Sequence, residues 1–444
     1  MTSTTALECP ATPEREYVFP QIVLTQAGTA TPRTRTGPGT VVRGPDGALA
    51  LRMAAVERVS LAEVFSWQGD AGALLPPDAF FDMAATDDDG RLWRSEQIVV
   101  SDKVDLSASG SDVRSILRSM STDCASPQQR VGFCLELVVH TRAKIVCNDV
   151  ESSNGAISST KLSLVAPDGS RVAILQRDGH LLVAAQNDTH EVSVMAVSHL
   201  LDGLSIASGE RMTVSNRYVR SPTLETTHVI SIGAVPHGQS IWPPFDMRAR
   251  RPAIAFVSAY ARFCHEVESP FYDAWLHIVS AWEQGLMHAA FPLGVGIERL
   301  LRDLFADRMV ETPPVLAAVE AMMTHLNSAS VDLEMRKRGR GALGKIKGRS
   351  PSGALKALAA EGWIDESLGI SWGAVRNRGA HGSSILKDET PEELQQGLDN
   401  LCRCLHLFYV LLLIRMGFTE SFVDHSRRGF PLTEARQGPP TVSA

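Results

Sequence analysis

Short alternations of hydrophobic and polar residues dominate the chain between about residues 17 and 235. The stretches EYVFPQIVLT and RVAILQ are strand-like, and the sequences GPDG, PDG and RDG supply turn residues between such stretches. The run KLSLVAPDGSRVAILQRDGHLLVAAQNDTHEVSVMAV has the pattern of successive strands joined by hairpins. We therefore expect a β-rich domain over residues 16–240, folded as a sandwich or barrel-like sheet, with one helix near SDVRSILRSM.

Beyond residue 253 the hydrophobic positions recur every three or four residues, which is the spacing of one buried helical face. We expect an all-α bundle over residues 253–430, with Met322 and Met323 in its core. The segment VPHGQSIWPPFDMRARRP, where the two patterns meet, is expected to be a linker. The chain is thus predicted to be an α+β protein with disordered tails at 1–15 and 431–444. The stretches with helical spacing are FYDAWLHIVSAWEQGLMHAAF, GIERLLRDLF, PVLAAVEAMMTHL and PSGALKALAAEGWI.

The last predicted helix has the clearest start. Thr390 can serve as its N-cap, Pro391 fits the first helical position, and Glu393 completes a capping box. The apolar run LHLFYVLLLI within it is too short to span a bilayer and is closely flanked by Arg403 and Arg415. We therefore expect the central helix of the bundle and no membrane partner. Its apolar positions are Leu394, Leu398, Leu401, Leu405, Phe408 and Leu412.

Composition narrows the classes of function. Hydrophobic residues make up 44% and charged residues 21% of the 444 residues, as in soluble globular proteins. The formal net charge of −7 argues against a protein that coats nucleic acid through its overall charge, so a nucleic-acid site must be a local basic patch. The first residues do not have the pattern of a secretory signal, and the seven cysteines form no CxxC pair. We expect reduced thiols and a cytoplasmic protein.

Three motifs that carry chemistry in other proteins are incomplete in this sequence or missing from it. Cys402, Cys404 and His406 resemble a zinc-ligand cluster, but on a helix Cys404 points about 160° away from Cys402, at about 100° per residue. The stretch PLGVGIERLL has no GK[ST] after it and is expected to be a flexible helix start. No GxSxG motif is present. We therefore expect no metal and no cofactor.

The stretch RKRGRGALGKIKGR concentrates cations in a chain of negative net charge. Glycines between cations describe a mobile loop that can mould onto phosphates. A solvated charged loop without a ligand and a protein-interaction loop explain the same residues. The candidate RNA-binding residues are Arg336, Lys337, Arg338, Arg340, Lys345, Lys347 and Arg349.

The stretch VRNRGAHG, Val375 to Gly382, ends the penultimate predicted helical segment. On an ideal helix Asn377 and His381 share a face, whereas Arg376 and His381 lie about 140° apart. Unwinding near Gly379 would bring the guanidinium and the imidazole together. Histidine exchanges protons near neutral pH and arginine binds phosphate oxygens, so the set suits phosphodiester chemistry. The same residues at a helix C-terminus also favour the helix dipole without any catalysis.

The sequence RNRGAH resembles the R-x4-H signature of the HEPN superfamily of α-helical ribonucleases and nucleotide-binding proteins. The ending AHG and the capped apolar helix after it are most similar to the ApeA-like HEPN proteins of bacterial anti-phage defence. The resemblance covers about residues 253–425. It implies a catalytic pair, Arg376 and His381, supported by Asn377. Arg378 is a candidate RNA-binding residue, either a second phosphate ligand or a solvated arginine. It also implies metal-independent cleavage, in which the 2′-hydroxyl of RNA attacks the adjacent phosphate.

One histidine per chain supplies only a base or an acid, whereas this reaction benefits from both. HEPN domains typically pair two motifs across a twofold axis, so the resemblance implies a homodimer through the helical domain. The expected function is an endoribonuclease, toxic to an infected cell and regulated by the β domain, with a phage-derived trigger or regulatory partner. The alternatives are a non-catalytic RNA- or nucleotide-binding module and a scaffold of a defence or toxin–antitoxin system.

Overall fold

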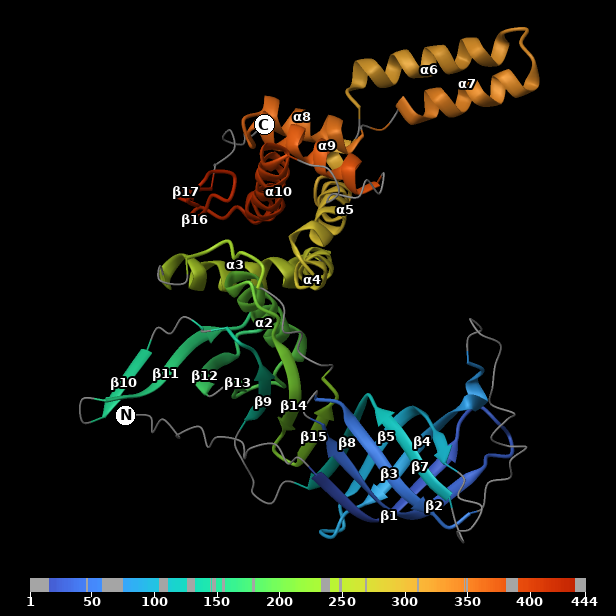
Figure 1. Ribbon diagram of the computed structural model, residues 1–444, viewed down its shortest axis with the longest axis vertical. Helices are drawn as coiled ribbons and strands as arrows, with labels where there is room; N and C mark the ends of the chain where they lie inside the picture. The colour runs from blue at the N-terminus through green and yellow to red at the C-terminus, as the bar shows by residue number, and fades with distance from the viewer. Residues whose placement is uncertain are drawn as a thin grey trace. The chain divides into compact units, whose positions relative to one another are not determined.

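The computed structural model divides the chain into two compact units. The β unit comprises Met1–Ser198 with Met212–Pro236, and the helical unit comprises His199–Arg211 with His237–Ala444 (Figure 1). The structure describes residues 16–44, 47–57, 75–103, 111–125, 132–143, 145, 149–153, 156–177, 180–232, 240–246, 250–267, 270–309, 311–346, 348, 350–380 and 390–435.

The β unit contains one antiparallel sheet of 15 described strands in the order β10-β11-β12-β13-β9-β14-β15-β8-β5-β4-β1-β2-β3-β7-β6. Most neighbours in this order are hairpin partners along the chain, which is the pattern that the alternating sequence and its turn residues predict. The strands are β1 (Glu16–Gln26), β2 (Thr34–Arg43), β3 (Leu49–Ala55), β4 (Phe80–Thr86), β5 (Leu92–Val99), β6 (Ser101–Lys103), β7 (Ser111–Leu117), β8 (Ser119–Ala125), β9 (Phe133–His140), β10 (Asp149–Ser153), β11 (Ala156–Val165), β12 (Arg171–Arg177), β13 (His180–Asn187), β14 (Thr213–Arg220) and β15 (Leu224–Ile230).

The strands β1 to β8 close into a barrel-like ring (Figure 1). Only Arg118 separates β7 from β8 and only Val100 separates β5 from β6, while β5 pairs with β8 and β6 pairs with β7. The sheet therefore meets itself and leaves no free edge along this seam. Its interior holds one apolar cluster that includes Phe19, Ile22 and Trp93.

The helix predicted near SDVRSILRSM is wrong, because this stretch forms β7 and the start of β8. Val113 and Leu117 are buried, whereas Arg114 and Ile116 are exposed, so burial alternates with the period of a strand. The hydrophobic positions recur with a period of two, which favours a strand, although the stretch also contains residues that favour helices.

The strand expected over EVSVMAV is also wrong. This segment begins α2 (Val194–Ser208), after β11, β12 and β13 have formed the expected meander. Ser193 caps the helix, because its hydroxyl oxygen accepts the backbone N–H of Ala196 at 3.2 Å.

A short turn of 3-10 helix, η1 (Pro77–Ala79), lies elsewhere in the β unit and precedes β4.

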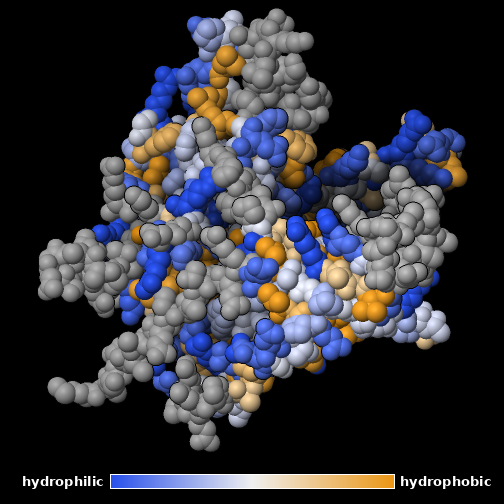
Figure 2. All heavy atoms as spheres, turned by 60° about the horizontal axis from the view of Figure 1, so that its bottom comes forward, coloured by the Kyte–Doolittle hydropathy of each residue, from blue (hydrophilic) through white to orange (hydrophobic). Residues whose placement is uncertain are grey.

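The coloured part of the surface in Figure 2 is mixed, with groups of hydrophobic residues scattered among hydrophilic ones. Among the exposed hydrophobic side chains of the β unit, Ile116 and Val165 are 62% and 63% accessible. Single exposed apolar residues of this kind are normal on surfaces in contact with water.

The helical unit holds eight further described helices and a short antiparallel pair, β16 (Ser421–Val423) with β17 (Leu432–Glu434). Pro292, which the sequence places in a flexible helix start, lies inside α5, so that prediction is wrong. The helices are α3 (Arg250–Glu266), α4 (Phe271–Trp282), α5 (Leu286–Leu304), α6 (Pro313–Ser328), α7 (Leu333–Ile346), α8 (Pro351–Ala360), α9 (Glu366–Ala380) and α10 (Pro391–Met416), with a 3-10 turn η2 (Ala306–Met309).

Helix α10 is the core of this unit. The predicted capping box is confirmed, because the Thr390 hydroxyl oxygen accepts the N–H of Glu393, whose carboxylate accepts the N–H of Thr390. Gly417 ends the helix in the left-handed region at φ 63°. In the part of the chain that the structure describes, α10 alone is long and apolar enough to cross a membrane, but 67% of its most apolar window is buried inside the protein. That burial is typical of a core helix.

The predicted linker is partly wrong, because residues 240–246 pack into the helical unit. Ile241 and Phe245 are buried, and the Tyr409 hydroxyl donates to the backbone oxygen of Trp242 at 3.1 Å. The predicted disordered tail begins too early, since Leu432–Glu434 pair with β16. The aromatic side chains of the predicted linker each bury a large apolar area. This burial packs the segment against the helices, although its prolines suggest a linker.

Candidate functional site

Helix α9 carries the first five residues of the RNRGAH stretch, Arg376 to Ala380. Asp365 caps its N-terminus, since its carboxylate accepts the N–H of Ser367 at 2.9 Å. Leu368, Trp372 and Val375 are buried at helical spacing and fix the face that α9 turns to the core. The expected unwinding at Gly379 is wrong, because the helix continues through Ala380.

Arg376 is held against α5. Its Nε donates to Glu298 Oε2 at 3.2 Å, and its guanidinium carbon lies 5.8 Å from the centre of the Phe291 ring. Gly294 makes this approach possible, because a Cβ there would lie 3.3 Å from Arg376 Cδ. Trp372 fixes the two helices in register by donating its indole N–H to the Gly294 oxygen at 3.0 Å.

The charge around Arg376 is not balanced. Glu298 also accepts a hydrogen bond from Arg302, one helical turn further along α5. Two guanidinium groups therefore share one carboxylate, and the Arg376 side chain is still 31% exposed. We call Arg376 and Asn377 of α9, with Phe291, Glu298 and Arg302 of α5, the Arg376 rim. This rim presents an excess of positive charge, which suits a phosphate group.

The structure describes the other residues of the motif to different extents. Asn377 is exposed. The backbone of Arg378 is helical but its side chain lies outside the described part, and His381 falls in the undescribed range 381–389. The structure therefore joins Arg376 to Glu298 and Phe291, and the expected pairing of Arg376 with His381 stays a prediction.

The sequence did not single out Glu298, Phe291 or Gly294 as parts of a site. The available signal was local: an acidic residue beside the apolar stripe of α5, with Arg302 four residues later. Such a pair is common on helices and gives no pointer to Arg376, which is 78 residues further along the chain.

Residues 336–346 of the basic stretch lie in helix α7, so the mobile loop predicted there is wrong. The Asp332 carboxylate caps α7 by accepting the N–H of Glu334 at 3.0 Å, and arginine and lysine are good helix formers. Gly339 allows α7 to approach α6 closely, since a Cβ there would lie 2.7 Å from the Leu326 side chain. Figure 1 draws α6 and α7 as an antiparallel pair, the α6–α7 hairpin.

Several cations of the α6–α7 hairpin have local partners. Arg336 donates to the oxygen of Ala329 at 3.0 Å, which closes the end of α6, and Arg340 donates to Asn327 at 2.7 Å. Arg338 lies 3.4 Å from Glu334. The remaining residues of the prediction are Lys337 and Lys345, both exposed, and Lys347 and Arg349, both outside the described residues.

The predicted hydrophobic core does not extend along this hairpin. Met322 is 56% exposed and Leu333 is 63% exposed, so the expectation that Met322 is buried is wrong. Val319 is the one buried residue of α6, and no described residue of α7 is buried. Two helices with so little burial are held mainly by their caps and by each other.

The Cys402, Cys404 and His406 pattern lies in the interior of α10. Burial raises the pKa of Cys402 to about 11, and Cys404 is fully buried. Both thiols are therefore protonated at neutral pH. Over the described ranges, no three His, Cys, Asp or Glu side chains gather in a way that could hold a metal ion. His406 instead faces Asp424, with 3.5 Å between Nδ1 and Oδ1.

No model of a known protein family and no curated protein sequence matches this chain.

Proposed function

We propose that the helical unit is a metal-independent endoribonuclease of the HEPN type. The observation that carries the proposal is the fixed position of Arg376, which has a carboxylate, an aromatic ring and a glycine of α5 around it. An arginine held in this way loses little conformational entropy when it binds a phosphate. The resemblance of RNRGAH to the HEPN signature supports the same assignment.

In the proposed reaction the RNA 2′-hydroxyl attacks the adjacent phosphorus, and the bond to the 5′-oxygen of the next nucleotide breaks. The products are a 2′,3′-cyclic phosphate and a free 5′-hydroxyl. Arg376 stabilises the charge on the phosphate oxygens, and His381 transfers a proton to or from one of the two oxygens. Asn377, exposed one residue after Arg376, orients the substrate or the imidazole.

The proposal includes a second copy of the chain. A homodimer through the helical unit supplies two motifs, and with them both a base and an acid. It also includes a cytoplasmic setting in bacterial anti-phage defence, where RNA cleavage stops an infected cell and the β unit restrains the activity until a phage-derived trigger arrives.

The test is cleavage of single-stranded RNA in EDTA by the purified full-length protein and by Arg376→Ala and His381→Ala. We expect each substitution to lower the rate by at least about 10²-fold, the usual contribution of a general acid or base or of one charge-stabilising donor. Arg415→Ala is the matched control, because Arg415 is an exposed arginine at the end of α10. Its cleavage rate should equal that of the unchanged protein.

The second candidate is RNA binding without catalysis, or a scaffold role in the same defence setting. The observation in its favour is the ion pair of Arg376 with Glu298, which has a structural role even without a substrate. RNA that is bound but uncut, with equal affinity in all three variants and the unchanged protein, would establish this candidate over the nuclease.

A further inference from the structure

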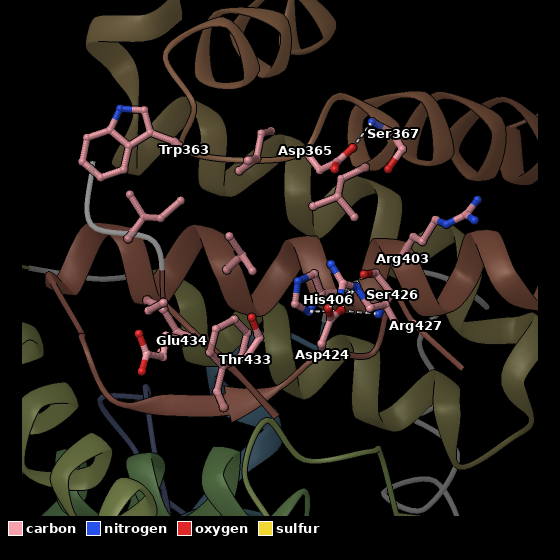
Figure 3. Close-up of a pocket in the computed structure, with 17 residues that line it drawn as sticks. Trp363, Asp365, Ser367, Arg403, His406, Asp424, Ser426, Arg427, Thr433 and Glu434 are labelled. Atoms are coloured by element: carbon pink, nitrogen blue, oxygen red, sulfur yellow. Dashed lines mark hydrogen bonds and ion pairs between the residues drawn. The ribbon is translucent and has the colours of Figure 1, made fainter. Parts of the chain in front are cut away.

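A cavity of about 240 Å³ lies in the helical unit, at the opposite end of α9 from Arg376. Its walls come from the α8–α9 turn, the C-terminal half of α10 and the β16–β17 pair (Figure 3). These three segments are separated in sequence by up to about 70 residues, and they meet because β16–β17 folds back over α10. The Arg376 rim contributes no residue to this cavity.

One part of the wall is apolar. Ile364, Leu368 and Leu413 line it and are buried, and Phe422 of β16 covers the side next to His406. The Phe422 and His406 rings are stacked, with centroids 5.4 Å apart and planes 9° from parallel. A flat apolar wall of this kind favours a planar ligand.

The other part of the wall is polar and built around Asp424. This buried carboxylate accepts the N–H of Ser426 at 2.9 Å, lies 3.3 Å from Arg427 Nε, and faces His406 Nδ1. The Ser426 hydroxyl bonds to Asp424 and not to His406, so these residues are not arranged as a Ser-His-Asp nucleophile. Because the Nδ1 edge of His406 lies toward Asp424, the Nε2 edge of the ring is turned away from it.

Arg403 adds a second cation to this part of the cavity. It lies on α10, three residues before His406, so both side chains are on neighbouring positions of one helical face. Within the described part of the chain, no carboxylate forms an ion pair with Arg403. Arg427 is 75% exposed and shares its ion-pair partner Asp424 with His406. The polar end therefore carries more positive than negative charge.

The two other carboxylates of the cavity do not cancel this charge. Asp365 is directed at the α9 N-terminus, where it accepts the N–H of Ser367. Glu434 is exposed, and Figure 3 shows it at the opposite end from Arg403. The cavity thus has a cationic end, and the apolar side chains of its wall lie among largely polar ones, an arrangement that can accept an amphipathic anion.

We propose that this cavity binds a small planar anion, an aromatic ring that carries one carboxylate or phosphate group. The ring lies against Phe422 and Leu413, and the anionic group is bound by Arg403 with His406. The cavity volume of about 240 Å³ exceeds that of an engineered cavity of about 150 Å³ that binds benzene, so it suits a single substituted ring. The proposal does not depend on ribonuclease activity, because none of its residues belongs to the Arg376 rim.

The test is titration calorimetry of the full-length protein with benzoate and, separately, with phenyl phosphate. We expect saturable binding with a Kd of about 1 mM or below for at least one of them, the range for a fragment of this size. Benzamide, the neutral counterpart of benzoate, should bind at least tenfold more weakly. Tighter binding of phenyl phosphate than of benzoate would identify phosphate esters as the class, and the reverse would identify carboxylates.

Arg403→Met should weaken binding of the anion at least tenfold, and Arg403→Lys should restore part of it. Arg415→Met is the matched control on the same helix, outside the cavity, and should leave the Kd unchanged. Val410→Phe, which adds volume at the cavity wall, should remove binding while the thermal midpoint of the free protein shows that the fold is kept. The proposal is overturned by absence of saturable binding at 10 mM, roughly tenfold above the expected Kd. Equal binding of benzamide, or equal effects of Arg403→Met and Arg415→Met, would overturn it as well.

Discussion

The helical unit contains two arginine-rich regions that are built in opposite ways. Arg376 lies on a packed helix and is held by Glu298, Phe291 and Gly294 of a second helix. The arginines of the α6–α7 hairpin are held by residues of the hairpin itself, and the hairpin has almost no buried side chains. The first region therefore holds its arginine in a defined position, whereas the second region concentrates charge on its surface. Catalysis requires that the reacting groups are held in defined positions, whereas affinity for RNA depends mainly on the number of cations that contact phosphates.

The largest expected difference between the packed helices of this unit and the α6–α7 hairpin is in stability. Leu405→Ala removes a fully buried side chain of α10 and should lower the free energy of unfolding by about 2–5 kcal/mol. Leu333→Ala, at a position 63% exposed on α7, should change it by less than about 0.5 kcal/mol. Urea unfolding followed by circular dichroism measures both. Equal losses would mean that the hairpin is packed against a partner in solution.

A half-buried carboxyl group of the packed helices should also make stability depend on pH. Burial raises the pKa of Asp202, in the part of α2 that belongs to the helical unit, to about 7, despite a hydrogen bond from Tyr272. The folded state thus holds this proton more tightly than the unfolded chain, whose value is near 3.8. Stability is greatest below that value and is lost as pH rises from about 4 to about 7.

Asp202→Asn should remove this loss and raise the free energy of unfolding at pH 8 by about 1–3 kcal/mol. At pH 5 the gain should be smaller, because the folded protein then already carries the proton. Asp307→Asn, an exposed aspartate of the same unit, is the matched control and should show no such pH dependence. Urea titrations at the two pH values decide between these outcomes.

Glu298→Gln tests whether position matters for the proposed reaction. Without the carboxylate, Arg376 loses its ion pair, and we expect RNA cleavage to slow about tenfold, mainly in kcat. Glu334→Gln removes the matching partner of Arg338 on α7 and should leave kcat unchanged. A faster reaction in Glu298→Gln would show instead that Glu298 keeps Arg376 away from the phosphate.

The smallest effect should come from charge on the hairpin. Neutralising Lys337 and Lys345 together should weaken RNA binding severalfold and flatten the slope of log K against log salt by about 1.4, at about 0.7 per phosphate contact. Lys356→Gln, an exposed lysine of α8, is the control. Fluorescence anisotropy with a labelled RNA over a salt series measures the slope. A slope that the double substitution leaves unchanged would make the hairpin a solvated surface.

The sequence alone predicted the features that neighbouring residues control. The start of α10 is correct to the residue, because Thr390 and Glu393 satisfy each other's backbone groups within one turn. The change from strands to helices is likewise visible in the period of the hydrophobic positions. Two predictions were wrong because local signals conflict. The glycines of α7 suggested a loop, but Asp332 caps a helix there. The helix formers of β7 suggested a helix, but its residues alternate in burial as in a strand.

Only the tertiary structure decided how distant segments meet. It brought Glu298 to Arg376 and closed β5–β6 against β7–β8. It also folded β16–β17 over α10 to form a cavity with Arg403, His406 and Phe422 in its wall. These contacts join residues that are far apart in sequence, and their selection depends on shape and burial summed over many side chains. A short motif fixes which chemical groups are present, and packing between helices fixes which of them can act together.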